Sequence, residues 1–293
     1  MTGATHKAMR SLKRAGNTTV KAAAVAADRV RRPGSGLVVL LYHRVGARTP
    51  MAVDLPAALF DEQMAWLAQR DTVTIDVALD ALVASRPDGH SRGDRPDGDG
   101  RSDRPIVVTF DDGTADLVDT ALPILVRHGI PSLWYLATDF IEHSRPFPHE
   151  GVALSWAAVR DAVSTGLVTL GSHTDTHLLL DRVAPAVAAA ELDRSCALIA
   201  ERVGVEARDL AYPKAVRPSA AVESIVRDRF RSAALGGCRG NRFGTTDPHR
   251  LSRSAIQTGD AMRYFEHKAT GGMALEDRLR VLVNRRRYAG AVT

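Results

Sequence analysis

The chain has few cysteines and no long apolar run, and each of these absences excludes a class of protein. Only two cysteines occur among 293 residues, Cys196 and Cys238, and they lie in unrelated contexts without CxxC spacing. Neither a disulfide framework nor a thiolate zinc site is indicated, so any metal must bind to His, Asp or Glu. No window reaches the roughly 18 consecutive apolar residues of a spanning helix, and the sequence therefore predicts no transmembrane segment.

The first 36 residues contain no stretch apolar enough for a secretory signal, because residues 20–27 are mostly alanine and include Lys21. From this we expect a cytoplasmic protein. Eight Lys and Arg face a single acid, Asp28, in this segment, which gives it +7 where the whole chain has +5. A second basic cluster lies at residues 278–287. Solvated helix faces are the common explanation, and peripheral contact with the anionic inner membrane face is the alternative. Without an aromatic stacking platform, no nucleic-acid partner is predicted.

What the chain does contain is typical of a globular protein of the α/β class. With 45% hydrophobic and 25% charged residues, it has the composition of one folded domain with extensions. Apolar runs typical of strands alternate with helical patterns, which predicts a parallel sheet closed into an irregular or incomplete (β/α) barrel. The expected strands are 37–42, 106–110, 132–137, 168–172, 210–212 and 231–235, and the expected helices are 56–70, 76–84, 115–128, 155–164, 185–203 and 219–229.

We divide the chain into three parts by composition. Residues 1–36 form a basic N-terminal extension, helical or flexible, residues 37–256 form the folded domain, and residues 257–293 form a basic C-terminal extension. Inside the domain, residues 86–105 hold five Arg, five Asp, four Gly and three Pro but no hydrophobic residue. Such a segment buries too little surface to offset chain entropy, so we expect a disordered insertion on the barrel face away from the chemistry.

Polar side chains follow three of the predicted strands directly. Asp111 and Asp112 end the run IVVTFDDG, at the strand mouth where α/β barrels keep their active sites. Asp-Gly is also a common turn dipeptide, so this motif alone favours a surface turn. His173 and His177 follow the next such strand in VTLGSHTDTH, and two imidazoles with one carboxylate leave open positions typical of a catalytic metal site. His43 follows the first strand, where it serves either as a strand cap or as a proton donor.

Taken together, these motifs resemble those of the polysaccharide deacetylase family, the NodB-homology proteins of carbohydrate esterase family 4. The branch that deacetylates exopolysaccharide is the most similar, because its early YHxV motif matches YHRV here. The resemblance covers roughly residues 37–256. Its motifs are TFDDG (109–113), SHTDTH (172–177) and LAYPKA (210–215), with GIPSLWYLAT (129–138) and LSWAAVRDAVSTG (154–166) between the first two.

The resemblance implies a role for each matching residue. Asp112, His173 and His177 would hold one divalent metal, with zinc favoured and Co²⁺, Ni²⁺ or Mn²⁺ as alternatives. Asp111 would be the general base, and His43 the general acid. A backbone N–H of Tyr212 would bind the oxyanion, Trp134 would contact substrate, and Arg253 would orient Asp111, with Arg217 as a substitute. His267 is a weak second choice for the acid. Lys214 and Ala215 depart from the usual AYPYG of this branch.

The implied function is hydrolysis of N-acetyl groups on an N-acetylhexosamine-containing glycan or glycan precursor. Because no export signal is predicted, a lipid-linked precursor at the inner membrane face is included among the expected substrates. One alternative is an amide hydrolase acting on a small N-acyl or cyclic amide metabolite. Another is a glycan-binding or scaffold protein without catalysis, which the paired carboxylates disfavour because their repulsion needs a cation or a proton to offset it. A phosphoacceptor domain would leave both histidines unused.

Overall fold

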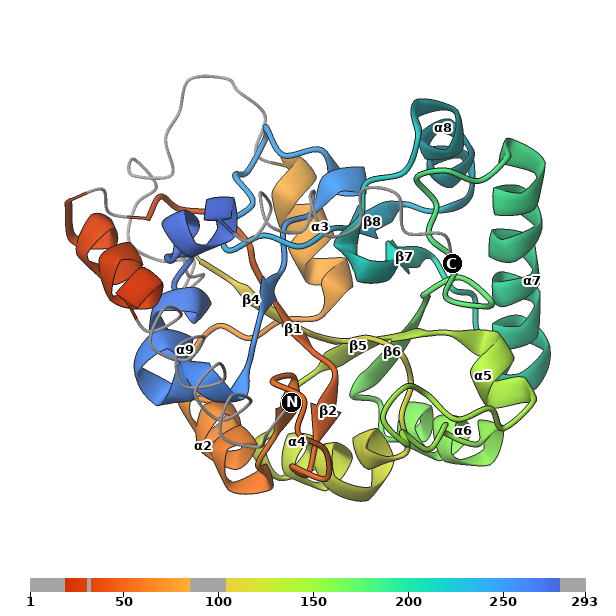
Figure 1. Ribbon diagram of the computed structural model, residues 1–293, viewed down its shortest axis with the longest axis horizontal. Coiled ribbons are helices and arrows are strands. Elements are labelled where there is room, and N and C mark those ends of the chain that lie inside the picture. The colour runs from red at the N-terminus through yellow and green to blue at the C-terminus, as the bar shows by residue number, and fades with distance from the viewer. Residues whose placement is uncertain (1–18, 31–32, 85–103, 280–293) are drawn as a thin grey trace, which may run out of the picture.

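A curled sheet of seven parallel strands forms the centre of the computed structural model, which describes residues 19–30, 33–84 and 104–279. Helices surround the sheet on its outer side (Figure 1). The strand order is β8-β7-β6-β5-β4-β1-β9, so consecutive strands from β4 to β8 are neighbours. The bounds are β1 Val38–Tyr42, β4 Ile106–Phe110, β5 Ser132–Leu136, β6 Val168–Ser172, β7 Asp209–Ala211, β8 Ser232–Ala234 and β9 Ser254–Ala255.

The segment 251–256, which contains β9, lies across the gap between β8 and β1. Leu251 pairs with β8 through its backbone, and Ile256 donates its N–H to the carbonyl of Leu41 in β1 at 2.9 Å. One irregular segment therefore contacts β8 and β1 in turn. The predicted irregular or incomplete (β/α) barrel is confirmed.

Every residue of β1, β4 and β5 is buried, as expected for parallel strands that are covered on both faces. Helix ends follow local chemistry: the hydroxyls of Ser155 and Ser219 cap α6 and α8, while Gly129 and Gly204 end α4 and α7 in the left-handed conformation. The helices are α2 Ala57–Leu67, α3 Ile75–Ala84, α4 Leu122–His128, α5 Thr138–Glu142, α6 Trp156–Ser164, α7 Pro185–Val203, α8 Ala220–Arg229 and α9 Ala261–Ala269.

All six predicted strands are present, with ends shifted by at most one residue. The predicted helix 115–128 is divided into a π-helical turn and α4, and the sequence reading missed β9, α5 and α9. The predicted insertion 86–105 lies almost entirely outside the described residues. Short elements complete the chain: β2 Arg44–Val45, β3 Asp54–Leu55, η2 Leu117–Ala121, η3 Pro213–Ala215, η4 Pro248–Arg250 and η5 Thr258–Asp260.

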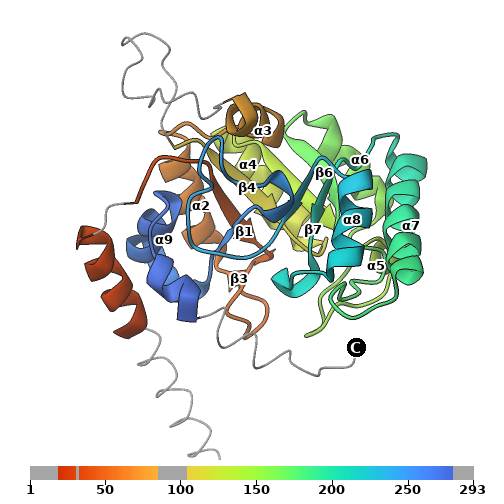
Figure 2. The same cartoon turned by 90° about the horizontal axis from the view of Figure 1, so that it is seen from above.

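A buried ionic cluster connects both ends of the described chain to the barrel. Lys21, in the helix formed by residues 19–30, donates a hydrogen bond to Asp260 at 2.6 Å. Lys268 of α9 donates to the other oxygen of Asp260 at 2.9 Å and to the carbonyl of Ala255 in β9, and lies 3.6 Å from Glu276. Figure 2 shows the N-terminal helix beside α9. The division into a domain with two extensions stays a prediction.

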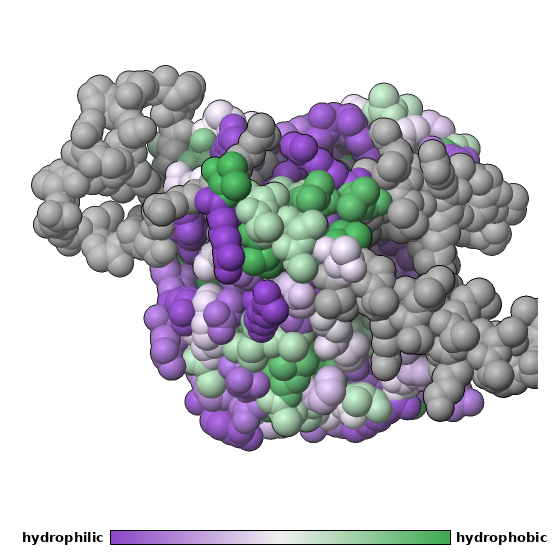
Figure 3. All heavy atoms as spheres, turned by 60° about the vertical axis from the view of Figure 1, so that its left-hand side comes forward, coloured by the Kyte–Doolittle hydropathy of each residue, from purple (hydrophilic) through white to green (hydrophobic). Residues whose placement is uncertain are grey.

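The outer face of this N-terminal helix is apolar. Ala22, Ala23 and Ala26 are exposed, and Val30 is 85% exposed. Figure 3 shows a green area over this part of the molecule, bordered by purple polar residues. Among the described residues, no helix is both long and apolar enough to cross a membrane.

We predict that the Asp260 cluster stabilises the fold strongly. Asp260→Ala leaves two buried ammonium groups without their shared carboxylate, so the free energy of unfolding should fall by about 3–5 kcal/mol. Urea unfolding measures this change. Asp193→Asn is the matched control, because the exposed Asp193–Arg229 pair should contribute only about 0–1 kcal/mol. Equal losses in the two variants would contradict the prediction.

Candidate active site

The polar residues that follow the strands meet in one groove at the carboxyl ends of the sheet. Its volume is about 1170 Å³. Asp111 and Asp112 follow β4, His173 and His177 follow β6, and His43 follows β1. Residues far apart in the sequence are brought together because parallel strands end at the same edge. Six of the predicted site residues line the groove: His43, Asp111, Asp112, His173, His177 and Arg253.

Asp112, His173 and His177 form a cluster suited to a metal ion. One ligand atom from each lies within 4.8 Å of the others. The Nε2 atoms of both histidines are 3.7 Å from Oδ1 of Asp112. The opposite ring nitrogen of His173, Nδ1, lies 2.8 Å from the carbonyl of Ala211, and this contact directs Nε2 into the groove. Two imidazoles and one carboxylate fit a divalent cation with open positions for other ligands.

The backbone around this cluster is strained. Asp112 has φ 75° and His177 has φ 62°, in the left-handed region that non-glycine residues seldom adopt. Gly113 follows with φ 101°, and a Cβ atom there would lie 3.1 Å from Leu136 and 3.2 Å from Ile141. The glycine of the DDG motif is therefore required by backbone conformation and by close packing. Strain at these positions is typical of functional sites rather than of surface turns.

A buried ion pair holds the second carboxylate of the motif. Arg253 is fully buried, and its two terminal nitrogens donate to the two oxygens of Asp111 at 2.6 and 2.8 Å. Burial by itself would raise the pKa of Asp111, but the charges of Arg253 and then His173 outweigh it and lower that pKa to about 2. Asp111 is therefore ionised and fixed in orientation at neutral pH.

His43 and His177 are both held neutral by their surroundings. Burial is the main cause that lowers the pKa of His43, while the charges of Asp112 and Asp111 act in the opposite direction. Its Nδ1 is buried without a hydrogen-bond partner in the described part of the chain. Burial also lowers the pKa of His177 to about 3, with smaller contributions from His173 and Lys214. Neutral imidazole is the form that binds a metal.

Two of the predicted substrate contacts are not where the resemblance placed them. The N–H of Tyr212 already donates to the carbonyl of Ala234 at 3.0 Å, so it is committed to the β7–β8 ladder and does not face an oxyanion. Trp134 is fully buried in the core of the barrel, and its indole N–H donates to Ser132 at 3.0 Å. Of the two alternative candidates, His267 for the acid does not line the groove, whereas Arg217 for the arginine does.

One wall of the groove was not predicted from the sequence. It is lined by residues of two segments: Leu235, Gly236 and Gly237, and Glu276, Asp277 and Leu279. Gly237 allows the close approach of the two segments, since a Cβ there would lie 3.2 Å from both Asp277 and Ser252. No motif marks these residues, and only the unusual Gly-Gly pair at 236–237 signals a tight approach.

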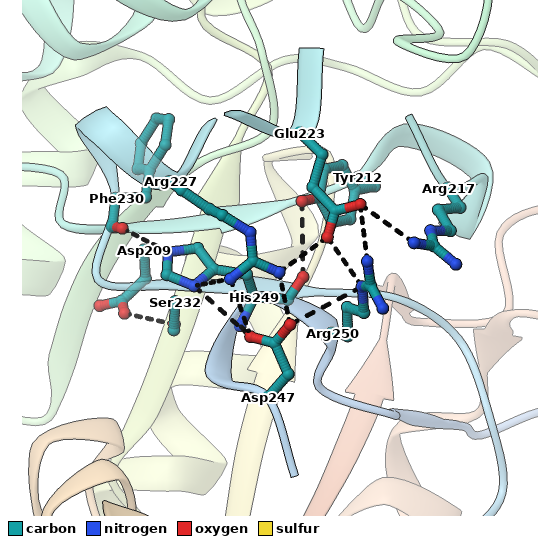
Figure 4. Close-up of polar contacts among 10 residues, drawn as sticks. All are labelled: Asp209, Tyr212, Arg217, Glu223, Arg227, Phe230, Ser232, Asp247, His249 and Arg250. Atoms are coloured by element: carbon teal, nitrogen blue, oxygen red, sulfur yellow. Dashed lines mark hydrogen bonds and ion pairs between the residues drawn. The ribbon is translucent and has the colours of Figure 1, made fainter. Parts of the chain in front are cut away.

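Behind another wall, Glu223 of α8 binds three arginines (Figure 4). Its carboxylate accepts hydrogen bonds from Arg250 at 2.7 and 3.0 Å, from Arg227 at 2.8 Å and from Arg217 at 3.2 Å. Arg227 also pairs with Asp247. The hydrogen bond from Arg250 is the largest of the effects that lower the pKa of Glu223 to about 2. The network joins α8 to η4 and to the loop after η3, and it fixes that side of the groove.

Comparisons with known proteins identify the same part of the chain. Residues 98–231 match the family model described as polysaccharide deacetylase, which confirms the resemblance seen in the motifs. The Bacillus subtilis protein YxkH, named as a candidate polysaccharide deacetylase, is 23% identical over 177 residues, which are 60% of this chain and 56% of that protein. The chain thus spans little more than half the length of this curated relative.

Solved structures of deacetylases have a similar fold. IcaB from Ammonifex degensii aligns with a TM-score of 0.64 at 23% identity, over 82% of this chain and 99% of its own. The Streptococcus pyogenes deacetylase PplD, solved in complex with acetate, aligns with a TM-score of 0.66 at 17% identity, over 80% of this chain and 99% of its own. At these identities the similarity establishes the incomplete (β/α) barrel.

We predict that the metal depends on Asp112 and not on Asp111. Asp112→Ala removes one of three ligands and should abolish binding of one equivalent of Zn²⁺, measured as metal content after dialysis. Asp111→Asn is the matched control, because the neighbouring side chain is directed to Arg253 and should retain the metal. Loss of metal in both variants, or in neither, would contradict this assignment.

Glu223 should make the stability of the protein sensitive to acid. Because the folded pKa of about 2 lies below the ordinary value of 4.5, its ionic contribution is complete above pH 4.5 and is lost as the pH falls toward 2. The difference in unfolding free energy between wild type and Glu223→Gln should therefore shrink over this interval. Exposed Glu201, changed to Gln, is the control and should give a small difference at every pH. A constant difference for Glu223 would disprove the expectation.

Proposed function

Since residues 98–231 of this chain carry a polysaccharide deacetylase domain, we propose that the protein is a metal-dependent hydrolase that removes N-acetyl groups from an N-acetylhexosamine-containing glycan or glycan precursor. The observation that carries this proposal is the adjacency of two units in one groove. One is the metal-competent cluster of Asp112, His173 and His177, and the other is the buried Asp111–Arg253 pair. Amide hydrolysis needs an activated water and a proton acceptor, and the two units supply these separately.

Each residue has a task that follows from its surroundings. A divalent cation at the cluster, with zinc favoured, would supply Lewis acidity and lower the pKa of water. Because Asp111 has a low pKa, it can accept a proton only from water that has been made more acidic in this way. Asp111 accepts the proton from the attacking water, and the fork of Arg253 keeps its oxygens in place during the reaction. His173 is held in one orientation by the carbonyl of Ala211.

His43 is the proposed proton donor to the leaving amine. It lines the groove, and its buried Nδ1 has no partner among the described residues. Burial lowers the pKa of His43 more than the charges of Asp112 and Asp111 raise it, so the imidazole starts neutral and must take up a proton before it can donate one. A histidine in this balance can gain a proton and release it again within one turnover. His267, the weaker alternative, lies outside the groove lining.

The size of the groove supports a glycan substrate. Its volume of about 1170 Å³ exceeds the roughly 300–1000 Å³ typical of pockets for small molecules. This favours an extended sugar chain over a small N-acyl or cyclic amide metabolite. The buried, paired Asp111 also argues against a scaffold protein without catalysis, because a carboxylate buried beside a second carboxylate is unfavourable unless a positive charge offsets it. Acetate, which was solved bound to PplD, is the product expected here. A lipid-linked substrate, membrane contact through the basic termini and a cytoplasmic location stay predictions.

We predict that the metal-loaded protein releases acetate from N-acetylglucosamine oligomers. Asp111→Asn, which keeps the shape of the side chain but removes the base, should lower kcat by about 10²–10⁴ with the metal still bound. Acetate is measured by a coupled assay at saturating oligomer. Asp161→Asn on the exposed face of α6 is the control and should leave kcat unchanged. Metal-loaded protein that releases no acetate from any N-acetylated sugar would refute the proposed function.

A further inference from the structure

The groove is lined by six cationic side chains and five carboxylates: Arg182, Lys214, Arg217, Arg239, Arg250 and Arg253, and Asp111, Asp112, Asp181, Glu276 and Asp277. Near the cluster of Asp112, His173 and His177, the charge of Arg253 is neutralised by Asp111. The charge of Arg182 is neutralised by its neighbour Asp181 at 2.6 Å. Lys214 also lines the groove, but no described carboxylate lies within ion-pair distance of its Nζ. The wall that it shares with Arg217 and Arg250 therefore has an excess of positive charge.

Lys214 is placed by a strained turn. It lies in η3, directly after β7, with φ 53°, and Ala215 follows with φ 56°. Two adjacent non-glycine residues in the left-handed region cost roughly 1–2 kcal/mol each, so surrounding contacts must hold them. Ala215 donates its N–H to the carbonyl of Tyr212 at 2.9 Å, and its methyl group packs against Gly236. The fold thus maintains an unfavourable turn that places an unpaired ammonium group in the groove.

Arg217 provides a second cation on the same wall. Its side chain is 57% exposed, and one nitrogen donates to Glu223 at 3.2 Å. Figure 4 shows its guanidinium at the edge of the network, on the other side of Glu223 from Asp247. Glu223 already accepts shorter hydrogen bonds from Arg250 and Arg227, so three guanidiniums share one carboxylate. In the described part of the chain Arg217 has no other acceptor, which leaves most of its donors open to a ligand.

We propose that Lys214 and Arg217 form a subsite for an anionic group on the glycan, a carboxylate or a phosphate carried by a sugar near the N-acetylated one. This inference rests on the proposed function and makes acidic glycans its preferred substrates. The ammonium group of Lys214 and the planar guanidinium group of Arg217 are donors of the kinds that bind carboxylate and phosphate oxygens. A purely structural role does not explain Lys214, which pairs with no described residue, and Glu223 keeps two arginines when Arg217 is removed.

The test is equilibrium binding to the full-length metal-loaded protein by isothermal titration calorimetry. The probes are a non-acetylated oligouronate, a sugar phosphate oligomer and a neutral N-acetylglucosamine oligomer. In the double variant Lys214→Gln/Arg217→Gln, Kd for at least one acidic probe should rise about tenfold or more, and Kd for the neutral oligomer should change much less. Arg127→Gln/Arg160→Gln is the matched control: both arginines are exposed, lie on α4 and α6, and do not line the groove.

Which acidic probe binds identifies the source of the anion. Weakening for the oligouronate alone assigns a carboxylate, and weakening for the sugar phosphate alone assigns a phosphate. If neither probe binds the wild type, or if the double variant and the control double variant bind them equally, the subsite is refuted. Acetate release from the neutral oligomer tests the proposed function separately, because that substrate does not need the subsite. Binding without acetate release would therefore refute the function and leave the subsite standing.

Discussion

The buried ion pair between Arg253 and Asp111 is the constraint on which the site depends. Arg253 is one of the largest fully buried side chains, and a guanidinium removed from water is stable only when it is paired. Arg253 lies in the segment 251–256, which lies across the gap between β8 and β1. Its hydrogen bonds to Asp111 join this segment to the end of β4. The same contact therefore joins the irregular side of the barrel to its regular side and keeps a carboxylate ionised. Losing either partner would leave an uncompensated charge in the groove.

Much of this arrangement can be predicted from the sequence, and particular residues show where prediction ends. The strands could be predicted because their apolar runs alternate with helical patterns, and polar residues such as Asp111 and His173 mark where two of them end. In contrast, β9 has two residues and no periodicity, and it is a strand only because its neighbours in space supply hydrogen bonds. Trp134 was misplaced for a related reason: β5 is buried on both faces, so alternation cannot show which side chains reach the groove. Tyr212 was misplaced because the use of its N–H depends on Ala234, in another strand.

The basic termini illustrate a limit of charge counting. In the sequence, Lys21 belongs to the basic N-terminal cluster and Lys268 to the predicted basic C-terminal extension, and such segments usually indicate solvated or membrane-binding faces. In the structure both are buried against Asp260, and Lys21 lies 239 residues away from that partner. A lysine this far from its carboxylate has no local signal for burial. The described parts of both termini instead contribute Val20, Glu276 and Leu279 to the groove lining, so residues outside the matched domain help to shape it.

The two kinds of charge in the groove have different origins, and this separates chemistry from recognition. Asp111 and Asp112 end a regular strand and carry the signature motif, so a family pattern predicts them. Lys214 lies where that pattern is broken, on a strained turn, and Arg217 lies just beyond the motif at the edge of the Glu223 network. Because Arg250 and Arg227 already satisfy Glu223, the network fixes this wall without consuming the charge of Arg217. The proposed reaction type therefore rests on the shared motif, and the proposed preference for an acidic substrate rests on residues outside it.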